Sequence, residues 1–243
     1  MEVLGIDIGG SGIKGAPVDV KKGVMLTERY RIPTPKSAKP EPVAKTVAKI
    51  AKYFNWDGPI GCGFPAVVRH GIIRTAANIH GNWIGTNAIE LFRKATNCPM
   101  NVINDADAAG LAEMTFGAGQ GRRGVVLLVT IGTGLGTSLF TNGVLLPNTE
   151  LGHIEIDCED AELMASDAAR KRDALSWEKW AKRLDTYLTR MESLIWPDLI
   201  ILGGGVSKKF DNFMPYLTVQ AEIVIAESLN EAGIIGAALA GKP

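Results

Sequence analysis

Short apolar runs that end at glycine recur along the chain and predict buried strands. The first run, Val3–Ile8, ends at Gly9-Gly10, and the run Val125–Ile131 ends at Gly132. Runs of this length that are bounded by turn residues are typical of strands. Further runs of the same kind are Ile60–Phe64, Met100–Ile103 and Leu199–Leu202.

Between these runs, apolar residues recur at steps of three and four and predict helices. One such pattern, Val43–Phe54, follows a proline-rich stretch, and a longer one runs from Trp177 to Met191 and stops before Pro197. We interpret the aromatic residues of the longer helix as core packing rather than as a ligand-binding box. Because strands and helices alternate throughout, the predicted fold class is α/β. Further helices are expected over residues 87–94, 105–114 and 233–239.

Two strand–glycine units in the chain are similar to each other. Asp7–Gly12 and Thr130–Gly134 both place a polar residue, Ile and a glycine turn at the end of a strand. Each is followed by a second apolar strand, Ile13–Val18 in the first unit and Ser138–Phe140 in the second. The pattern indicates an internal repeat of a strand–turn–strand hairpin, which suits two similar lobes.

Composition removes several classes of function. Lys plus Arg and Asp plus Glu both total 26 in the 243 residues, so the formal net charge is zero and a broad basic surface for nucleic acid is not expected. Three widely spaced cysteines, Cys62, Cys98 and Cys158, form neither a disulfide framework nor a zinc ligand set, and we expect them as thiols of a cytoplasmic protein. The N-terminus lacks the pattern of a signal peptide, and no apolar run approaches the ~20 residues of a membrane span.

The glycine turns are candidates for phosphate binding, because a turn without side chains lets consecutive backbone N–H groups approach an anion. Such a turn also serves a plain hairpin, and Gly9–Gly12 or Gly132–Gly134 alone favours neither function. Both turns together with Gly203–Gly205 favour phosphate binding. The P-loop pattern is absent from the sequence, and the first turn lacks the spacing of a dinucleotide fingerprint.

Polar residues at the ends of two predicted strands are candidates for catalysis. Asp7 can hold Mg²⁺, directly or through water, or it can cap its turn, and Lys14 is either near the same phosphate or a solvated strand residue. Asn104 and Asp105 end a strand and begin a helix, where both residue types are favoured as helix N-caps. Clefts of α/β proteins open at the same place, so a carboxylate there can also take the proton from a sugar hydroxyl that attacks phosphorus.

A third signal is the pair Glu150 and His153, which are three residues apart with Gly152 between them. This spacing can present two hydrogen-bonding groups to one cleft. A single His is more often structural, and no other His or Cys lies near enough in the sequence to indicate a metal site.

Taken together, these segments resemble the ROK sugar kinases, which belong to the wider actin-like ATPase fold. The resemblance implies a two-lobed α/β fold of the actin-like ATPase (ribonuclease H-like) class. It implies a small lobe of residues 1–104, on which a C-terminal helix in residues 230–243 packs back, and a large lobe of residues 105–229. The matching segments occur in the order of the family and span almost the whole chain: Asp7–Gly15, Asn104–Ala108, Thr130–Gly136, Glu150–His153 and Leu202–Ser207.

The chain departs from most of the family just after His153. ROK kinases usually carry a cysteine-rich zinc motif there, whereas this sequence has Cys158 alone, so a structural zinc is not expected. The next segment, Glu162–Ser166, is still similar to the family, whose Glu at this place binds the sugar. The missing motif is similar to the branch of the family that phosphorylates glucose with inorganic polyphosphate and, in some members, with ATP. Three more segments resemble that branch: Gly12–Asp19, Pro147–His153 and Trp196–Ile201.

The resemblance implies that Asp105 is the general base for the 6-hydroxyl of glucose and that Asp7 lies near Mg²⁺, with ATP as a second donor beside polyphosphate. It also implies a homodimer that binds neither nucleic acid nor membrane. The residues implied to bind the sugar are Asn78, Asn104, Asp105, Glu150, His153 and Glu162. Those implied to bind the phosphates of the donor are Asp7, Gly9, Gly10, Ser11, Gly12, Lys14, Gly132, Thr133, Gly134, Gly204 and Gly205.

Several alternatives stay open. In the first alternative, ATP is the sole phosphoryl donor. In the second, the acceptor is a hexose other than glucose. A third is a non-catalytic sugar sensor, but the family's repressors carry a helix–turn–helix before the first strand, which here starts at Val3. Asp105 argues against an inactive scaffold. Basic residues that could guide a polyphosphate chain are favoured as a solvated helix face: Arg170-Lys171-Arg172, Lys179, Lys182-Arg183 and Lys208-Lys209.

Overall fold

The computed structural model describes residues 1–77, 79–228 and 231–242. The chain forms two compact units. The first unit consists of Met1–Phe116 with Glu231–Pro243, and the second consists of Gly117–Asn230. The lobe limits derived from the resemblance stay a prediction; the first compact unit also contains the helix that begins at Asp105.

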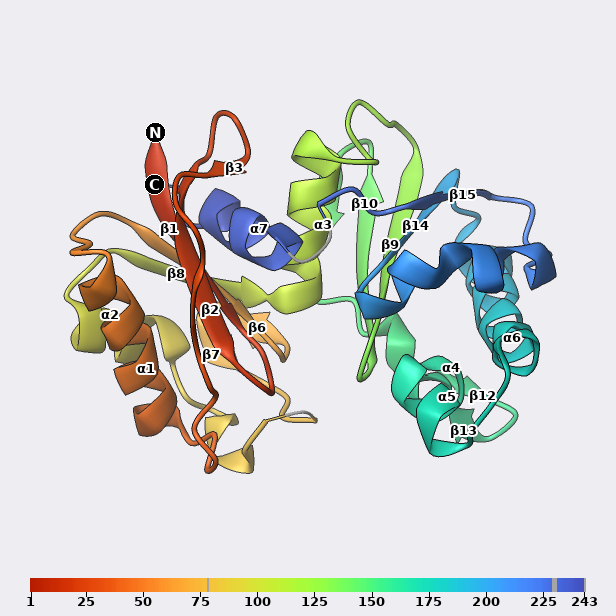
Figure 1. The fold of residues 1–243 in the computed structure, drawn as a ribbon, viewed down its shortest axis with the longest axis horizontal. Helices are drawn as coiled ribbons and strands as arrows, with labels where there is room; N and C mark the ends of the chain where they lie inside the picture. The colour runs from red at the N-terminus through yellow and green to blue at the C-terminus, as the bar shows by residue number, and fades with distance from the viewer. Residues whose placement is uncertain (78, 229–230, 243) are drawn as a thin grey trace. The chain divides into compact units, whose positions relative to one another are not determined.

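The first unit is built on one mixed sheet (Figure 1). Strand β1 pairs with β2 in antiparallel fashion, while β5 runs parallel to β1 and β8 runs parallel to β5. The carboxyl ends of β1, β5 and β8 therefore lie at one edge of the sheet. The strands in spatial order are β3 (Val24–Met25), β2 (Ile13–Asp19), β1 (Glu2–Ile8), β5 (Ile60–Phe64) and β8 (Met100–Asn104), with β4 (Tyr30–Ile32) also pairing with β2.

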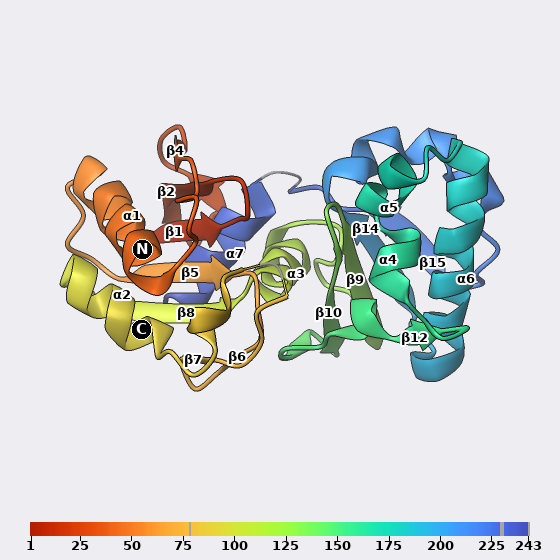
Figure 2. The same ribbon diagram turned by 90° about the horizontal axis from the view of Figure 1, so that it is seen from below.

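Helices cover both faces of this sheet (Figures 1 and 2). Helices α1 (Pro40–Tyr53) and α2 (Ala88–Thr96) pack on one face around a core that includes Ile6 and Phe64. Helices α3 (Asp105–Phe116) and α7 (Ala232–Ala240) pack on the other, around Val3 and Ile234. Smaller elements of this unit are β6 (Val68–Arg69), β7 (Ile72–Ile73) and the 3₁₀ helix η1 (Gly81–Trp83).

Glycines let α7 approach both the sheet and α3 at backbone distance. A Cβ at Gly61 on β5 would collide with the carbonyl of Ala237, and a Cβ at Gly236 would collide with the carbonyl of Ala108. Each substitution to Ala would push backbone apart rather than a flexible side chain. The small-residue helix that the tail sequence predicts is therefore confirmed as α7, and its glycines serve close packing.

The second unit has its own five-stranded sheet, and it repeats the hairpin of the first. Strands β9 and β10 form an antiparallel hairpin, and β14 runs parallel to β9 on its other side, as β5 does to β1. The predicted internal repeat of a strand–turn–strand hairpin is thus confirmed. The strands in spatial order are β11 (Val144–Leu146), β10 (Leu135–Thr141), β9 (Val125–Ile131), β14 (Leu199–Gly203) and β15 (Glu222–Ile225).

One long helix, α6 (Trp177–Ile195), provides much of the core of the second unit. Trp180, Leu184 and Leu188 are fully buried, and the Trp180 ring meets that of Phe213 edge-on at 5.2 Å between centroids. The interpretation of the aromatic stripe as core packing is confirmed. The remaining elements are η2 (Leu151–His153), β12 (Glu155–Ile156), β13 (Glu159–Asp160), α4 (Ala161–Ala165), α5 (Asp167–Arg172), η3 (Gly205–Asn212) and η4 (Met214–Tyr216).

None of the helices in the described part of the chain has the length and apolar character needed to cross a membrane.

Candidate active site

The turn between β1 and β2 carries the candidate phosphate-binding residues of the first unit. A backbone hydrogen bond from Gly9 N to Gly12 O, 3.1 Å long, closes it. Asp7 lies opposite Lys14 in the register of the two strands, and Asp7 Oδ2 is 3.1 Å from Lys14 Nζ. The two side chains are only 17% and 24% exposed. An ion pair with this little exposure holds both charges close to the turn.

Asp7 fits the part of a magnesium ligand. Gly233 of α7 packs closely against the Asp7 carboxylate, because a Cβ at this glycine would lie 2.6 Å from Asp7 Oδ2. Mg²⁺ is commonly held by one or two carboxylates together with waters and substrate phosphate oxygens. A single carboxylate beside a glycine turn provides the protein ligand for such a site.

Two side chains that sequence reasoning missed hold the same turn. Arg31 on β4 donates from Nη2 to Ser11 O at 2.8 Å, and Thr34 donates from Oγ1 to Gly9 O at 2.6 Å. A Cβ at Gly12 would lie 2.5 Å from Arg31 Nε, so glycine is what lets the guanidinium approach the turn. Only the register of β4 against β2 brings these side chains to the turn, and nothing in the local sequence indicates this pairing.

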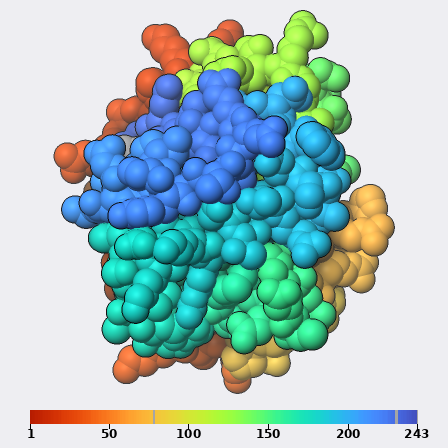
Figure 3. Space-filling model, turned by 90° about the vertical axis from the view of Figure 1, so that its right-hand side faces the viewer, coloured from red at the N-terminus to blue at the C-terminus, as the bar shows by residue number. Residues whose placement is uncertain are grey.

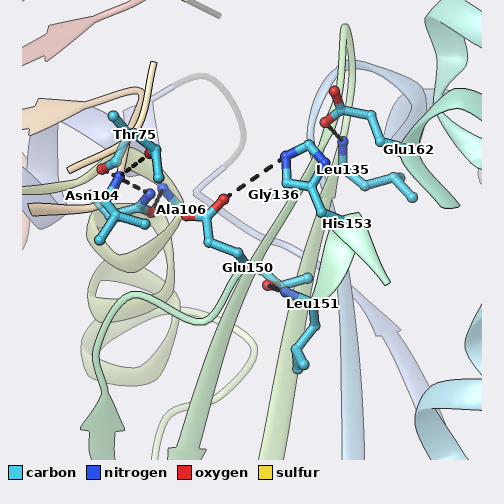
Figure 4. A network of polar contacts seen from close by, with 12 residues as sticks. Thr75, Asn104, Ala106, Leu135, Gly136, Glu150, Leu151, His153 and Glu162 are labelled. Atoms are coloured by element: carbon cyan, nitrogen blue, oxygen red, sulfur yellow. Dashed lines mark hydrogen bonds and ion pairs between the residues drawn. The ribbon is translucent and has the colours of Figure 1, made fainter. Parts of the chain in front are cut away.

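Asn104 and Asp105 lie where β8 ends and α3 begins. Asn104 Oδ1 accepts hydrogen bonds from Ala106 N at 2.8 Å and Asp107 N at 3.0 Å, and Asn104 Nδ2 donates to Ala66 O at 3.3 Å (Figure 4). Asn104 is thus the helix N-cap that its residue type favours. Its role in sugar binding stays a prediction.

Asp105 is partly buried in the first turn of α3. Its Oδ1 accepts a hydrogen bond from Ala106 N at 2.8 Å. A carboxylate fixed in this way at the edge of the sheet is placed to accept a proton.

At the turn between β9 and β10, a carboxylate accepts a hydrogen bond from the backbone. The turn is closed by the hydrogen bond from Gly132 N to Gly134 O at 3.0 Å. Leu135 N donates to Glu162 Oε2 at 2.9 Å (Figure 4). A Cβ at Gly134 would collide with that carboxylate. Glu162, the residue implied to bind the sugar, is therefore held by the backbone of the second turn.

Glu150 and His153 lie at the two ends of the 3₁₀ turn η2, and Asp160 holds the His ring. His153 Nε2 is 3.9 Å from Glu150 Oε2 (Figure 4). His153 Nδ1 is 2.9 Å from Asp160 Oδ2. The other oxygen of Asp160, Oδ1, accepts a hydrogen bond from Glu162 N at 2.8 Å and caps α4. One carboxylate thus positions two candidate sugar ligands, and sequence reasoning did not single it out.

The negative charges around His153 decide its titration. Burial lowers the pKa of His153, but the hydrogen bond to Asp160 and the charges of Glu162, Asp160 and Glu150 outweigh burial, so its pKa lies above the ordinary value. Burial raises the pKa of Glu150, with His153 lowering it and Glu162 raising it to a smaller extent. Near neutral pH, His153 therefore carries more positive charge than an exposed His does.

The third glycine run follows β14 and begins η3. Gly204 has φ +82°, and a Cβ there would collide with the backbone of Ile131, so both conformation and space require glycine. A Cβ at Gly205 would meet nothing within 4 Å, which leaves that residue open to a ligand. Ser207 Oγ donates to Gly204 O at 2.8 Å and fixes the turn.

A tight hairpin of β12 and β13 follows His153, in the segment where this sequence lacks the cysteine-rich zinc motif. Its turn residues Asp157 and Cys158 have φ of 52° and 67°. Cys158 is exposed, and no described residues form a group of three or more His, Cys, Asp or Glu that could hold a metal ion. The expectation that zinc is absent stays a prediction. Asn78, the remaining candidate sugar ligand, lies outside the described residues.

Most of the basic residues considered for a polyphosphate track form ion pairs with nearby acids. They lie on and around α5 and α6, in the surface of residues 160–225 that Figure 3 shows in teal to blue. This pairing supports the interpretation as a solvated helix face. The pairs are Arg170 and Lys171 with Asp167, Arg172 and Arg183 with Asp173, and Lys182 with Glu178.

Solved structures define the class of fold. The inorganic polyphosphate/ATP-glucomannokinase from Arthrobacter sp. strain KM superposes with a TM-score of 0.94 at 47% identity, covering 98% of this chain and 97% of that one. A ROK family glucokinase from Streptomyces griseus, in complex with glucose and AMPPNP, superposes with a TM-score of 0.84 at 24% identity, covering 98% of both chains. The predicted α/β fold of the actin-like ATPase class is confirmed.

Sequence comparison then defines the family. The polyphosphate glucokinase of Mycobacterium tuberculosis (strain CDC 1551 / Oshkosh) is 46% identical over 238 residues, which cover 98% of this chain and 90% of that protein. The model of the ROK family matches residues 3–164. The chain belongs to the ROK family.

Proposed function

We propose that this protein is a glucokinase that transfers a phosphoryl group from inorganic polyphosphate, and also from ATP, to the 6-hydroxyl of glucose. The observation that carries the proposal is the Asp105 carboxylate, fixed in the first turn of α3 at the sheet edge that also carries the glycine turn. The similarity along nearly the whole chain to a polyphosphate glucokinase and to a polyphosphate/ATP-glucomannokinase supports both donors.

Asp105 acts as the general base. As the 6-oxygen of glucose attacks the terminal phosphorus, its proton passes to the Asp105 carboxylate, and the phosphoanhydride bond to the rest of the donor breaks. The products are glucose 6-phosphate and a polyphosphate shortened by one phosphate, or ADP. Positioned proton transfer of this kind typically contributes about 10²- to 10⁴-fold to the rate.

The glycine turns bind the donor. The N–H groups of the Gly9–Gly12 turn, with Lys14 beside them, bind its phosphate oxygens, and the turns at Gly132–Gly134 and Gly204-Gly205 provide further N–H groups. Asp7 would hold Mg²⁺, and the bound ion would neutralise part of the charge that phosphoryl transfer develops. The place of the Asp7 carboxylate near the end of β1, beside the glycine turn, supports this role.

The sugar hydroxyls are bound by carboxylate, amide and imidazole groups. In the second unit, the side chains of Glu150, His153 and Glu162 form hydrogen bonds with the sugar hydroxyls. The contacts that hold these side chains in place support this assignment. Asn104 and Asn78 complete the proposed set. Such groups hold the sugar so that its 6-oxygen is the one presented to phosphorus, which is the orienting part of catalysis.

One assay tests the proposal. Purified protein is incubated with glucose, Mg²⁺ and either inorganic polyphosphate or ATP, and glucose 6-phosphate is measured. We expect product with both donors. Product from ATP alone would leave a glucokinase without the polyphosphate activity, and product from neither donor would leave the non-catalytic sugar sensor, which glucose binding without turnover would support. A panel of hexoses in place of glucose tests the acceptor.

We further propose that the enzyme works as a homodimer in the cytoplasm. The resemblance to the ROK kinases supports the dimer, and the free cysteines, of which Cys62 and Cys98 are buried, suit a reducing compartment. Sedimentation equilibrium over a range of protein concentrations measures the mass; a mass of one chain throughout would contradict the dimer.

A further inference from the structure

The strand register places Arg31 on the face of the first sheet that also carries Asp7 and Lys14. Arg31 lies directly opposite Lys14 between β4 and β2, and Lys14 lies directly opposite Asp7 between β2 and β1. Directly opposed residues of antiparallel strands point to the same face. The neighbour of Arg31, Tyr30, stacks on Tyr53 of α1 at 3.8 Å between ring centroids, which puts Arg31 on the other face.

Asp7, Lys14 and Arg31 form a row across three strands, and their charges do not balance. Lys14 forms an ion pair with Asp7, whereas no carboxylate in the described part of the chain forms an ion pair with Arg31. Two cations directly opposite each other on a sheet repel. Asp7, Lys14 and Arg31 together carry one net positive charge. An anion bound between or beside the two cations would remove their repulsion.

The guanidinium of Arg31 is also positioned at the turn that the proposed function assigns to the donor. It donates one hydrogen bond, to Ser11 O at 2.8 Å, and a Cβ at Gly12 would lie within 2.6 Å of its Nε, Cζ and Nη2 atoms. A guanidinium has further N–H donors, in a planar fork that matches the oxygens of a phosphate group. The side chain as a whole is exposed, so these donors are accessible.

We propose that Arg31 is a ligand for the phosphate chain of the donor, binding the oxygens of a phosphate group next to the Gly9–Gly12 turn. The inference rests on the proposed function in that the donor is a phosphoanhydride chain. Arg31 is then a donor-binding residue that takes no part in the proton transfer at Asp105. The opposing explanation is that Arg31 only braces the turn through Ser11.

Binding of inorganic polyphosphate in the absence of glucose, measured by isothermal titration calorimetry over a range of salt concentrations, tests the proposal. The variants are R31Q and R31K, with K22Q as the matched control, because Lys22 is an exposed cation in the turn beyond the far end of β2. The melting temperature of each variant shows whether it is folded. KM values for polyphosphate, ATP and glucose are then measured for the same proteins.

We expect R31Q to weaken polyphosphate binding about tenfold, as the loss of a hydrogen bond from a charged group does. The slope of log affinity against log salt should become shallower by about one unit, because one cation fewer meets the polyanion. R31K should bind with an affinity between those of R31Q and wild type, since Lys keeps the charge without the fork. K22Q and the KM for glucose should stay within about twofold of wild type.

Several results would overturn the proposal. Polyphosphate affinity of R31Q equal to that of K22Q excludes a ligand role, and weaker binding with an unchanged salt slope assigns Arg31 to bracing alone. If R31Q does not fold, an unchanged polyphosphate affinity of R31K overturns it in the same way. A raised KM for one donor only assigns Arg31 to that donor. Failure of the wild type to form glucose 6-phosphate would refute the proposed function, while polyphosphate binding still tests Arg31.

Discussion

The two glycine turns of the molecule have the same pattern in sequence and different electrostatic surroundings. Gly9 and Gly132 each donate a backbone hydrogen bond across their turns, at 3.1 and 3.0 Å. Cations from Lys14 and Arg31 lie beside the first turn, whereas the carboxylate of Glu162 lies against the second. A repeated backbone motif therefore does not imply repeated surroundings, because the second turn also holds a candidate sugar ligand, Glu162, through Leu135 N.

The difference suggests a division of labour between the units. The first unit contains the cations that suit a polyanionic donor and Asp105, the carboxylate that we propose as the general base. The second contains an acidic cluster around His153, in which Glu150, Asp160 and Glu162 face the imidazole. Such a cluster suits neutral sugar hydroxyls, which can donate hydrogen bonds to its carboxylates. Variants that change donor binding, sugar binding or proton transfer separately test this division.

Asp105→Asn should have the largest effect. The amide cannot accept the proton of the 6-hydroxyl, so we expect kcat to fall by about 10²- to 10⁴-fold. The KM for glucose should change little, because the ligands of the second unit are intact, and Asn also favours the first turn of a helix. Steady-state kinetics and a thermal unfolding curve measure both. Near-normal kcat in a folded protein would refute the assignment of Asp105 as the base.

Gly134→Ala should affect the sugar side. The new Cβ meets the carboxylate of Glu162 and pushes it away from Leu135 N, so a charge-assisted hydrogen bond is lost. We expect the KM for glucose to rise about tenfold, with the KM for polyphosphate changed less. Kinetics with each substrate varied in turn decide this. A rise confined to the polyphosphate KM would mean that the second turn acts on the donor alone and that Glu162 does not bind the sugar.

Gly12→Ala is the matching change on the first turn and should have a smaller effect. The Cβ meets the guanidinium of Arg31, the far end of a flexible side chain that can move aside. We expect the KM for polyphosphate to rise about threefold, as a hydrogen bond to charge is weakened rather than lost, and the KM for glucose to stay unchanged. Equal effects on the two KM values would remove the distinction between the turns.

The sequence predicts the strands and the hairpin repeat well, because each depends on local apolar patterns such as Val125–Ile131, whose observed bounds are the same. The sequence also predicts the helix N-cap at Asn104, as the alternative to a catalytic role for this segment. Arg31 and Asp160 were missed, because strand register brings Arg31 to Ser11 and the β12–β13 hairpin brings Asp160 to His153. Local pattern carries backbone geometry, while the charge around a site depends on tertiary contacts.

Asp160→Asn should change the titration of His153. Asn caps α4 as well as Asp does, but the negative charge beside Nδ1 is lost, so we expect the pKa of His153 to fall towards its ordinary value. An NMR titration of the imidazole measures it. The control is Asp157→Asn, which removes one charge from the exposed turn of the same hairpin, where Asn tolerates the positive φ.

The sign for stability follows from the raised pKa. His153 contributes stability that is fully present below the pKa of an unfolded His, about 6.5, and is lost as the pH rises through the higher folded pKa. The free energy of unfolding of the wild type, from urea titrations, should therefore fall more between about pH 5.5 and about pH 8 than that of the Asp160→Asn protein. The same pH dependence in both proteins would show that Asp160 does not set the charge of His153.

Lys182→Gln should have the smallest effect. Lys182 Nζ is 2.8 Å from Glu178 Oε1 on the exposed face of α6, so its charge is already compensated within the helix. We expect the KM for polyphosphate to stay within about twofold of wild type, as for other exposed ion pairs of this kind. R31Q, measured beside it, removes a cation for which the described residues provide no carboxylate partner. A KM raised equally by both would mean that the donor chain also contacts α6, and that partnered cations bind polyphosphate as well as Arg31 does.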